Sequence, residues 1–237
     1  MHKYVVPDHI RARVMRLQGK PFALESIDAA RTALVVVDMQ NYYVAEGYPS
    51  HSPEAPTIAP NINRIAAALR AAGGRVVWIQ TDSAEALSKW GKHHKYKLTP
   101  ENAARRLKLL SEGDEGFKLY KELEPKPQDL YVRKIKFSAM IGDSSNLDAV
   151  LRQHKLDTLL VAGTKTNVCC ESTARDASMM EYRVALLSDA CATSTDEEHA
   201  AALNGFQVSF GDVMTVDEAI EKLRISSAMG PGISSAA

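Results

Sequence analysis

The chain of 237 residues has little cysteine: Cys169, Cys170 and Cys191 are the three it contains. A small, odd number argues against a disulfide framework, and this spacing matches no structural zinc site. There is no run of about 18 apolar residues, so we expect no membrane span. The charged N-terminal stretch lacks an apolar core, so we expect no secretion signal. These absences favour a cytoplasmic protein, because thiols stay reduced in that compartment.

An excess of charge of one sign is also missing. Lys and Arg number 29, Asp and Glu number 29, and the formal net charge is zero. This balance gives no reason to expect nucleic acid or an anionic membrane as a partner. What remains is a normal globular composition in a chain long enough for one α/β domain. A net charge near zero is compatible with self-association, and we expect a homo-oligomer, either a dimer or a tetramer.

Strand-like and helix-like patterns alternate along the chain. Continuous apolar runs predict strands at residues 32–38, 75–80, 131–134, 158–163 and 184–187, and near residue 213. Apolar residues at helical spacing predict helices at residues 60–72, 100–110, 144–154, 168–182 and 216–223, and another from Thr195 or Asp196 to residue 203. This alternation predicts the α/β class: a three-layer α/β/α fold of Rossmann-like type, with a central, mostly parallel, six-stranded sheet.

The chain is interpreted as one domain with additions. Residues 1–30 form an N-terminal extension, expected to hold a short helix and an irregular arm. Residues 31–225 form the domain. Within it, residues 81–128 form a long polar insertion with one expected helix, and we interpret this insertion as a lid. Residues 226–237 are rich in Gly, Ser and Ala and are expected to form a flexible tail.

Polar residues gather where the predicted strands end. In an open parallel sheet, sites lie beyond the carboxyl ends of the strands. Asp38, Lys134 and the loop leading to Cys169 occupy such ends, as do Gln80 and Asp82. An acid, an amine and a thiol are therefore expected at comparable depth on one edge of the sheet.

Cys169 lies in the first turn of the helix predicted at residues 168–182. Free amides and the helix dipole favour a thiolate there, so we expect a lowered thiol pKa, and a nearby Lys134 would lower it further. Asp38 could accept the thiol proton and return it to a departing nitrogen. The alternative is that Cys169 is a small buried hydrophobe and that Asp38 caps the following loop. Cys170 points about 100° away and is expected in the core, as is Cys191.

Three segments carry a family resemblance. Residues 33–41 read ALVVVDMQN, residues 134–140 read KIKFSAM, and residues 163–177 read GTKTNVCCESTARDA. In order and spacing they resemble the opening strand, the lysine segment and the nucleophile loop of isochorismatase-like cysteine hydrolases, over roughly residues 32–223. The closest similarity is to the branch of N-carbamoylsarcosine amidases and ureidoacrylate amidohydrolases.

The resemblance implies a role for each matching residue. Asp38 would be the general acid and base, Lys134 the stabiliser of the thiolate and of the transition state, and Cys169 the nucleophile. A cis peptide between Thr164 and Lys165 is also implied, with the amides of Lys165 and Cys169 as oxyanion donors.

The implied activity is cleavage of a C–N bond in a small amide, carbamoyl or ureido substrate, through a covalent thioester-type intermediate and without a cofactor. The residues beside the motifs are the expected substrate contacts: Gln40, Asn41, Tyr43, Phe137 and Asn167. The aromatic members of this set could equally belong to the core.

The chain departs from the family pattern in three places. Nicotinamidase relatives hold a metal through an Asp-x-His after the second strand, whereas residues 81–84 read TDSA here, so we expect no metal. Lys165 stands where small or neutral residues are usual, and it could pair with a substrate carboxylate or point to solvent or a subunit contact. Met140 replaces the usual aromatic residue, which would widen the pocket.

Other functions fit these residues less well. A nicotinamidase-type amidase is disfavoured by the missing ligands, and a vinyl-ether hydrolase by the retained cysteine. A non-catalytic scaffold or a redox-sensing thiol protein is the alternative from another class, although adjacent cysteines on one helix pair poorly as a disulfide.

Overall fold

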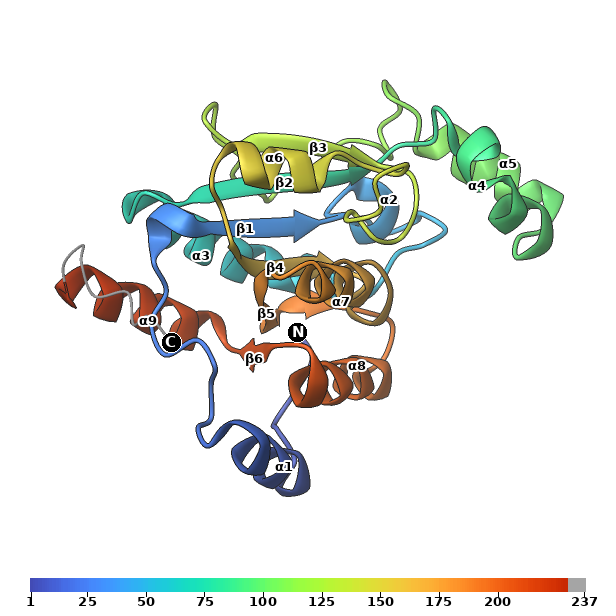
Figure 1. Cartoon of the computed structure of the whole chain (residues 1–237). Coiled ribbons are helices and arrows are strands. Elements are labelled where there is room, and N and C mark those ends of the chain that lie inside the picture. The colour runs from blue at the N-terminus through green and yellow to red at the C-terminus, as the bar shows by residue number, and fades with distance from the viewer. Residues whose placement is uncertain (230–237) are drawn as a thin grey trace.

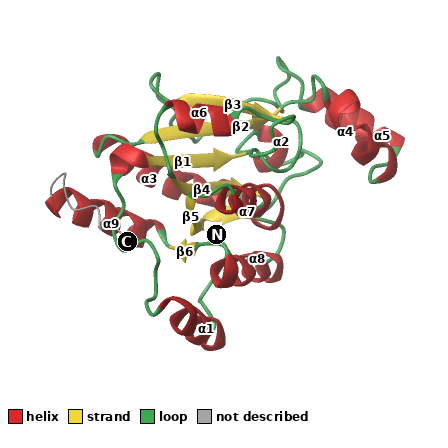
Figure 2. Cartoon of the chain, in the orientation of Figure 1, coloured by secondary structure: helices red, strands yellow, loops and turns green. Residues whose placement is uncertain are grey.

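The computed structural model describes residues 1–229, and their side chains as far as Ile225. Within this part of the chain, six strands form one parallel sheet in the order β3-β2-β1-β4-β5-β6 (Figures 1 and 2). The strands are β1 Thr32–Val37, β2 Arg75–Thr81, β3 Leu130–Lys134, β4 Thr158–Thr164, β5 Arg183–Ala192 and β6 Asp212–Met214. The predicted fold class is therefore confirmed, and the described sheet is parallel throughout.

Helices connect the strands. They are α1 Asp8–Gln18, α2 Asn41–Val44, α3 Ala59–Ala71, α4 Ala86–Tyr96, α5 Pro100–Leu109, α6 Leu147–Gln153, α7 Glu171–Met179, α8 Asp196–Ser209 and α9 Val216–Met229. The start of α8 is settled by its cap, because the Thr195 hydroxyl accepts the Glu198 amide at 3.1 Å.

The continuous apolar run of β1 lies between two cores. All six of its residues are buried. Because side chains alternate along a strand, Leu34 and Val36 face the layer that contains α3 and α9, whereas Val35 and Val37 face the layer that contains α6, α7 and α8. Figure 1 shows α6 and α7 on the near face of the sheet. A central strand covered on both faces has its polar positions only at its ends, which is why Asp38 stands out.

The N-terminal extension packs against the domain. Its helix α1 ends at Gly19, whose φ of 73° gives the left-handed turn that glycine adopts without a side-chain clash. Helix α1 contacts α8, and the segment before it places His2 in a buried position beside Thr193 and Asp196. The extension therefore reaches the loop that follows β5.

The helices of the insertion and the end of the last helix differ from the sequence prediction. Two helices rather than one occupy the insertion, and they contact each other (Figure 1). The missed helix, α4, contains Gly91 and a kink at Trp90, where φ is −143°, so it has no clear helical period. Helix α9 continues to Met229, beyond the helix end predicted at residue 223, whereas the flexible tail at residues 226–237 stays a prediction. Residues 230–237 of that tail lie outside the described residues.

None of the helices in the described chain combines the length and the apolar character needed to cross a bilayer.

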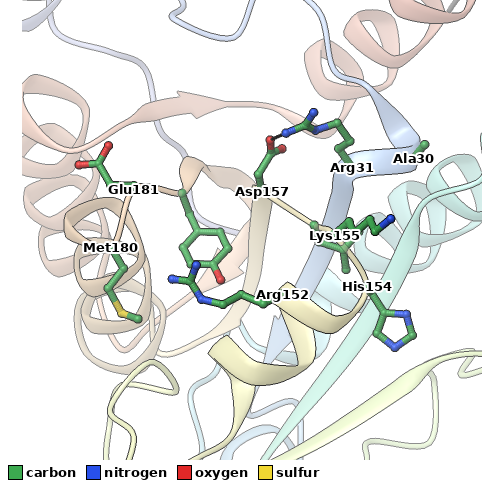
Figure 3. Close-up of a pocket in the computed structure, with 10 residues that line it drawn as sticks. Ala30, Arg31, Arg152, His154, Lys155, Asp157, Met180 and Glu181 are labelled. Atoms are coloured by element: carbon green, nitrogen blue, oxygen red, sulfur yellow. Dashed lines mark hydrogen bonds and ion pairs between the residues drawn. The ribbon is translucent and has the colours of Figure 1, made fainter.

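The amino ends of β1, β4 and β5 border an open depression of about 800 Å³ (Figure 3). Its rim holds Arg31, Arg152 and Asp157, and each of the three takes part in an ion pair. These charges are satisfied within the chain, on the edge opposite the polar strand ends.

Candidate active site

Asp38 follows β1 and is fully buried. Its backbone has a positive φ of 52°, and its amide donates to the Ile79 carbonyl at 3.0 Å. The two carboxylate oxygens have separate partners: Oδ2 accepts from Lys134 Nζ at 2.7 Å, and Oδ1 accepts from the Thr81 hydroxyl at 2.9 Å. Asp38 therefore contacts groups from β2 and β3, the two strands on one side of β1, and it does not serve merely as a loop cap.

Lys134 is the last residue of β3 and is 1% exposed. Its Nζ donates to Asp38, to the Thr81 hydroxyl at 2.8 Å, to the Lys136 carbonyl at 3.2 Å and to Cys169 Sγ at 3.6 Å. Burial is the largest single effect on this amine and would lower its pKa, but Asp38, Cys169 and Tyr43 together outweigh burial and the pKa is raised. The side chain is thus an ammonium held against both the carboxylate and the thiol.

Cys169 lies 5% exposed in a π-helical turn, Thr166–Cys170, that precedes α7. This corrects the prediction of a lowered thiol pKa in the first turn of an α-helix. Burial raises the pKa of Cys169 to about 12, and the nearby Lys134 charge offsets only part of that effect. A hydrogen bond with Asp38 also favours the protonated thiol. The resting group is therefore a neutral thiol beside a proton acceptor.

Thr81 is a site residue that the sequence interpretation missed. It ends β2, is 2% exposed, and its hydroxyl joins Lys134 to Asp38. Strand order contains the signal that could have found it, because β2 lies between the strands that carry the acid and the amine. A polar residue at the end of that middle strand must face the same edge.

Gln40 has a different position from the one expected of a substrate contact. Its side-chain carbonyl accepts the Thr81 amide at 2.8 Å, and its side-chain nitrogen donates to the carbonyls of Thr81 and Phe117 at 3.0 and 2.9 Å. Both amide hydrogens are used, and the residue is fully buried. Gln40 therefore holds the end of β2 in place rather than facing a ligand.

The loop before Cys169 has the expected backbone form, with a cis peptide bond between Thr164 and Lys165. The Lys165 carbonyl accepts hydrogen bonds from the amides of Val168 and Cys170, the residues on either side of Cys169. The Lys165 ammonium lies in an exposed position, 3.3 Å from the Ser194 hydroxyl.

Side chains of this loop are held by residues of α8 and of the loop after β5. Asn167 accepts the Thr193 hydroxyl at 2.6 Å, so its side-chain oxygen is tied to the loop after β5. The Thr166 hydroxyl lies 2.9 Å from Nδ1 of the buried His199. The ring of His199 stacks on His2 with centroids 4.5 Å apart. The N-terminal segment thus supports the nucleophile loop through stacked rings.

The other two cysteines face the core. Cys170 and Cys191 are fully buried, and their sulfurs lie against the carbonyls of Ala162 and Val161. All three cysteines are free thiols. This arrangement agrees with the interpretation that Cys169 alone faces the polar edge.

The remaining expected substrate contacts are Asn41, Tyr43 and Phe137, and each of them touches the insertion. Asn41 donates its side-chain amide to the Glu115 carbonyl at 2.8 Å in an exposed position. Tyr43 is buried, and its hydroxyl accepts from Arg106 of α5 at 3.2 Å. Phe137 meets Trp90 of α4 edge-on, with centroids 4.7 Å apart. The insertion therefore touches the site through both of its helices.

Asp82 and His93 have partners other than a metal ion. Asp82 accepts the Ala84 amide and an Arg133 guanidinium hydrogen. His93 stacks on Trp90 at 3.9 Å between ring centroids. Among the described residues, no group of three or more His, Cys, Asp and Glu side chains could hold a metal ion.

Comparison with known proteins identifies the family. The isochorismatase domain model matches residues 32–218, which contain Asp38, Lys134 and Cys169. This chain belongs to the isochorismatase family. The ureidoacrylate amidohydrolase RutB of Pseudomonas savastanoi pv. phaseolicola is 35% identical over 228 residues, which cover 90% of this chain and 91% of that protein.

Solved structures of similar proteins have the same fold. A cysteine hydrolase from Pseudomonas syringae pv. phaseolicola superposes with a TM-score of 0.78 at 28% identity, covering 88% of this chain and 100% of that one. The N-carbamoylsarcosine amidase of Thermoplasma acidophilum gives a TM-score of 0.61 at 26% identity, with coverages of 79% and 97%. Both resemblances agree with the family that the three sequence motifs indicate.

Proposed function

We propose that this chain is a cysteine hydrolase that cleaves the C–N bond of a small ureido or carbamoyl substrate. Cys169 is the nucleophile, Asp38 the general acid and base, and Lys134 the fixed positive charge beside them. The observation that carries the proposal is the contact of one buried ammonium with both the carboxylate, at 2.7 Å, and the sulfur, at 3.6 Å.

The enzyme class is firm. The chain is a hydrolase that acts on carbon–nitrogen bonds of linear amides, as predicted, because it belongs to the isochorismatase family and its relatives include amidohydrolases. The ureido substrate is inferred from the name of the RutB relatives and from the residues of the site. The homo-oligomer and the cytoplasmic location stay predictions.

The first step forms a covalent intermediate. As the sulfur of Cys169 attacks the substrate carbonyl carbon, its proton passes to Asp38, with which the thiol already shares a hydrogen bond. The buried ammonium of Lys134 stabilises the negative charge that develops on sulfur and on the tetrahedral centre. The amides of Lys165 and Cys169 are the proposed donors to the oxyanion.

The second half of the cycle releases the products. Asp38 gives its proton to the departing nitrogen, the C–N bond breaks, and the acyl or carbamoyl group stays on sulfur as a thioester or thiocarbamate. Water then enters, Asp38 removes one of its protons, and the hydroxide adds to the same carbon. The C–S bond breaks, and the proton returns to the sulfur.

The test compares two neighbouring cysteines. Cys169→Ala is expected to abolish turnover of every amide or ureido substrate that the wild type cleaves, because it removes the attacking atom. Cys170→Ala is the matched control, since its side chain faces the Ala162 carbonyl in the core. Rapid quenching followed by intact-mass analysis should detect the acyl or carbamoyl adduct on the wild type and on Cys170→Ala. Full activity of Cys169→Ala would show that the reaction does not use this thiol.

A redox-sensing function predicts a different result. In that case oxidation would join Cys169 to a second cysteine, and hydrolysis would be absent from the wild type. The burial of Cys170 and Cys191 among core residues argues for the hydrolytic function.

A further inference from the structure

Arg106 of α5 carries a positive charge that the described chain does not neutralise. Its Nη1 donates to the Tyr43 hydroxyl at 3.2 Å, and its guanidinium carbon lies 5.8 Å from the centroid of the Tyr42 ring. Among the described residues, no carboxylate lies within ion-pair distance of this side chain. Both recorded partners are aromatic residues of α2, the short helix that follows Asp38.

The helix that carries Arg106 is fixed to the edge of the sheet. Its end is tied down by Ser83, whose hydroxyl donates to the Leu107 carbonyl at 2.6 Å and whose amide donates to the Leu110 carbonyl at 3.1 Å. Ser83 lies two residues beyond Thr81, the hydroxyl that joins Lys134 to Asp38. Arg106 sits in the last turn before this anchor, so its place beside the reacting groups is set by the sheet edge itself.

Arg106 is close enough to act on the nucleophile. Its charge lowers the pKa of the Cys169 thiol, against the larger effect of burial. Tyr43 does not balance that charge, because burial raises its pKa to about 12 and it stays a neutral phenol. The phenol accepts from Arg106 and keeps its own hydrogen, for which the described residues supply no acceptor. The other N–H groups of Arg106 and the phenol hydrogen of Tyr43 therefore point to an anion at this place.

We propose that Arg106 and the Tyr43 hydroxyl form a subsite for the carboxylate of the substrate, so that the enzyme prefers ureido acids to neutral ureas. This inference rests on the function proposed above. A planar guanidinium donates two parallel hydrogen bonds to a carboxylate, and a poorly solvated cation without a counter-ion gains most from such a partner. Lys165, the other candidate cation, lies exposed against Ser194 instead.

The test uses two substrates of similar shape. One is 3-ureidopropionate, and the other is N-propylurea, which lacks the carboxylate. Arg106→Gln should lower kcat/KM for the acid by about 10- to 100-fold and change that for the neutral urea by less than about threefold. Tyr43→Phe should give a smaller loss of the same selectivity. Arg105→Gln is the matched control, because Arg105 is an exposed neighbour on the same helix.

Binding separates this proposal from the one on which it rests. Calorimetric titration of Cys169→Ala with 3-ureidopropionate should show binding, and the double variant Cys169→Ala/Arg106→Gln should lose about 10-fold or more in affinity. If the wild type hydrolyses neither compound, the proposed function fails, and the titration still decides the subsite. Equal affinities in the two variants, no binding to either, or equal losses for acid and neutral urea would each overturn the carboxylate subsite.

Discussion

The hydroxyl of Thr81 is the part of the site that a conservative substitution can remove cleanly. It accepts one hydrogen of the Lys134 ammonium at 2.8 Å and donates its own hydrogen to Asp38 Oδ1 at 2.9 Å. Thr81→Val keeps the shape of the side chain and removes both hydrogen bonds. The ammonium keeps Asp38 Oδ2, the Lys136 carbonyl and the Cys169 sulfur as neighbours, whereas Oδ1 loses the hydroxyl that donates to it.

The expected loss of stability follows from the hydrogen bonds that are lost and kept. One buried hydrogen bond to a charged group is worth about 1.5–3 kcal/mol, so Thr81→Val should reduce the free energy of unfolding by about 2–3 kcal/mol. The carboxylate and the ammonium also lose the bridge that fixes their relative position. A displacement of reacting groups by a fraction of an ångström to 1 Å costs up to about 100-fold in rate, so kcat should fall by about 10- to 100-fold.

The assay pairs urea denaturation with steady-state kinetics. Thr81→Ser is the control, since serine keeps the hydroxyl, and it should stay within about threefold of the wild-type kcat/KM. Because the Thr81 backbone is held by Gln40 in all three proteins, the comparison isolates the hydroxyl. If Thr81→Val unfolds at the wild-type urea concentration and keeps the wild-type kcat, the hydroxyl does not position Asp38 and Lys134, and this reasoning is wrong.

Two predictions concern protons. Burial, and then the charge of His2, lower the pKa of His199 from 6.5 to about 4. Between these pH values, His199 is therefore protonated in the unfolded chain and neutral in the folded chain. The contribution of the neutral His199 to the free energy of unfolding, up to about 3 kcal/mol, should be present above pH 6.5 and lost as the pH falls towards 4. In urea titrations at pH 7 and 4.5, His199→Asn should therefore lose less stability between the two pH values than the wild type. Equal losses would contradict the assignment. Because burial raises the pKa of Cys169 to about 12, the rate of its alkylation by iodoacetamide should still be rising at pH 10. If the thiol behaved as an exposed one, intact-mass kinetics would instead show a rate that has its midpoint at about pH 8.5 and levels off above it.

Elements with a strong local pattern could be predicted from the sequence. The apolar run of β1, the helix pattern of α3 and the Thr-x-x-Glu cap of α8 each specify their structure within a short window. The two helices of the insertion could not be predicted equally well. Helix α5 has Thr99 and Pro100 at its start, whereas α4 has no side-chain cap and is kinked at Trp90.

The site shows the same division. Asp38, Lys134 and Cys169 stand at predicted strand ends or in a motif, so their convergence follows from the order of the strands. The protonation of Cys169 did not follow, because it depends on how much water reaches the sulfur and therefore on side chains distant in sequence. Arg106 was missed for a related reason. Its partner Tyr43 lies 63 residues earlier in the chain, and the two meet where α5 is anchored on Ser83.

The charges of the site connect its chemistry with its specificity. Asp38 and Lys134 balance each other, the Cys169 thiol is neutral, and Arg106 leaves one positive charge unmatched among the described residues. In the empty site, the field of Arg106 favours loss of the thiol proton. A bound carboxylate would cancel that field, so the proton would stay on sulfur until the substrate carbonyl is in place and Asp38 accepts it. The thiol is protonated in the empty site as well, because burial outweighs that field. In the proposed mechanism Asp38, rather than the medium, therefore accepts the proton as the sulfur attacks, and the same proton is then at hand for the departing nitrogen.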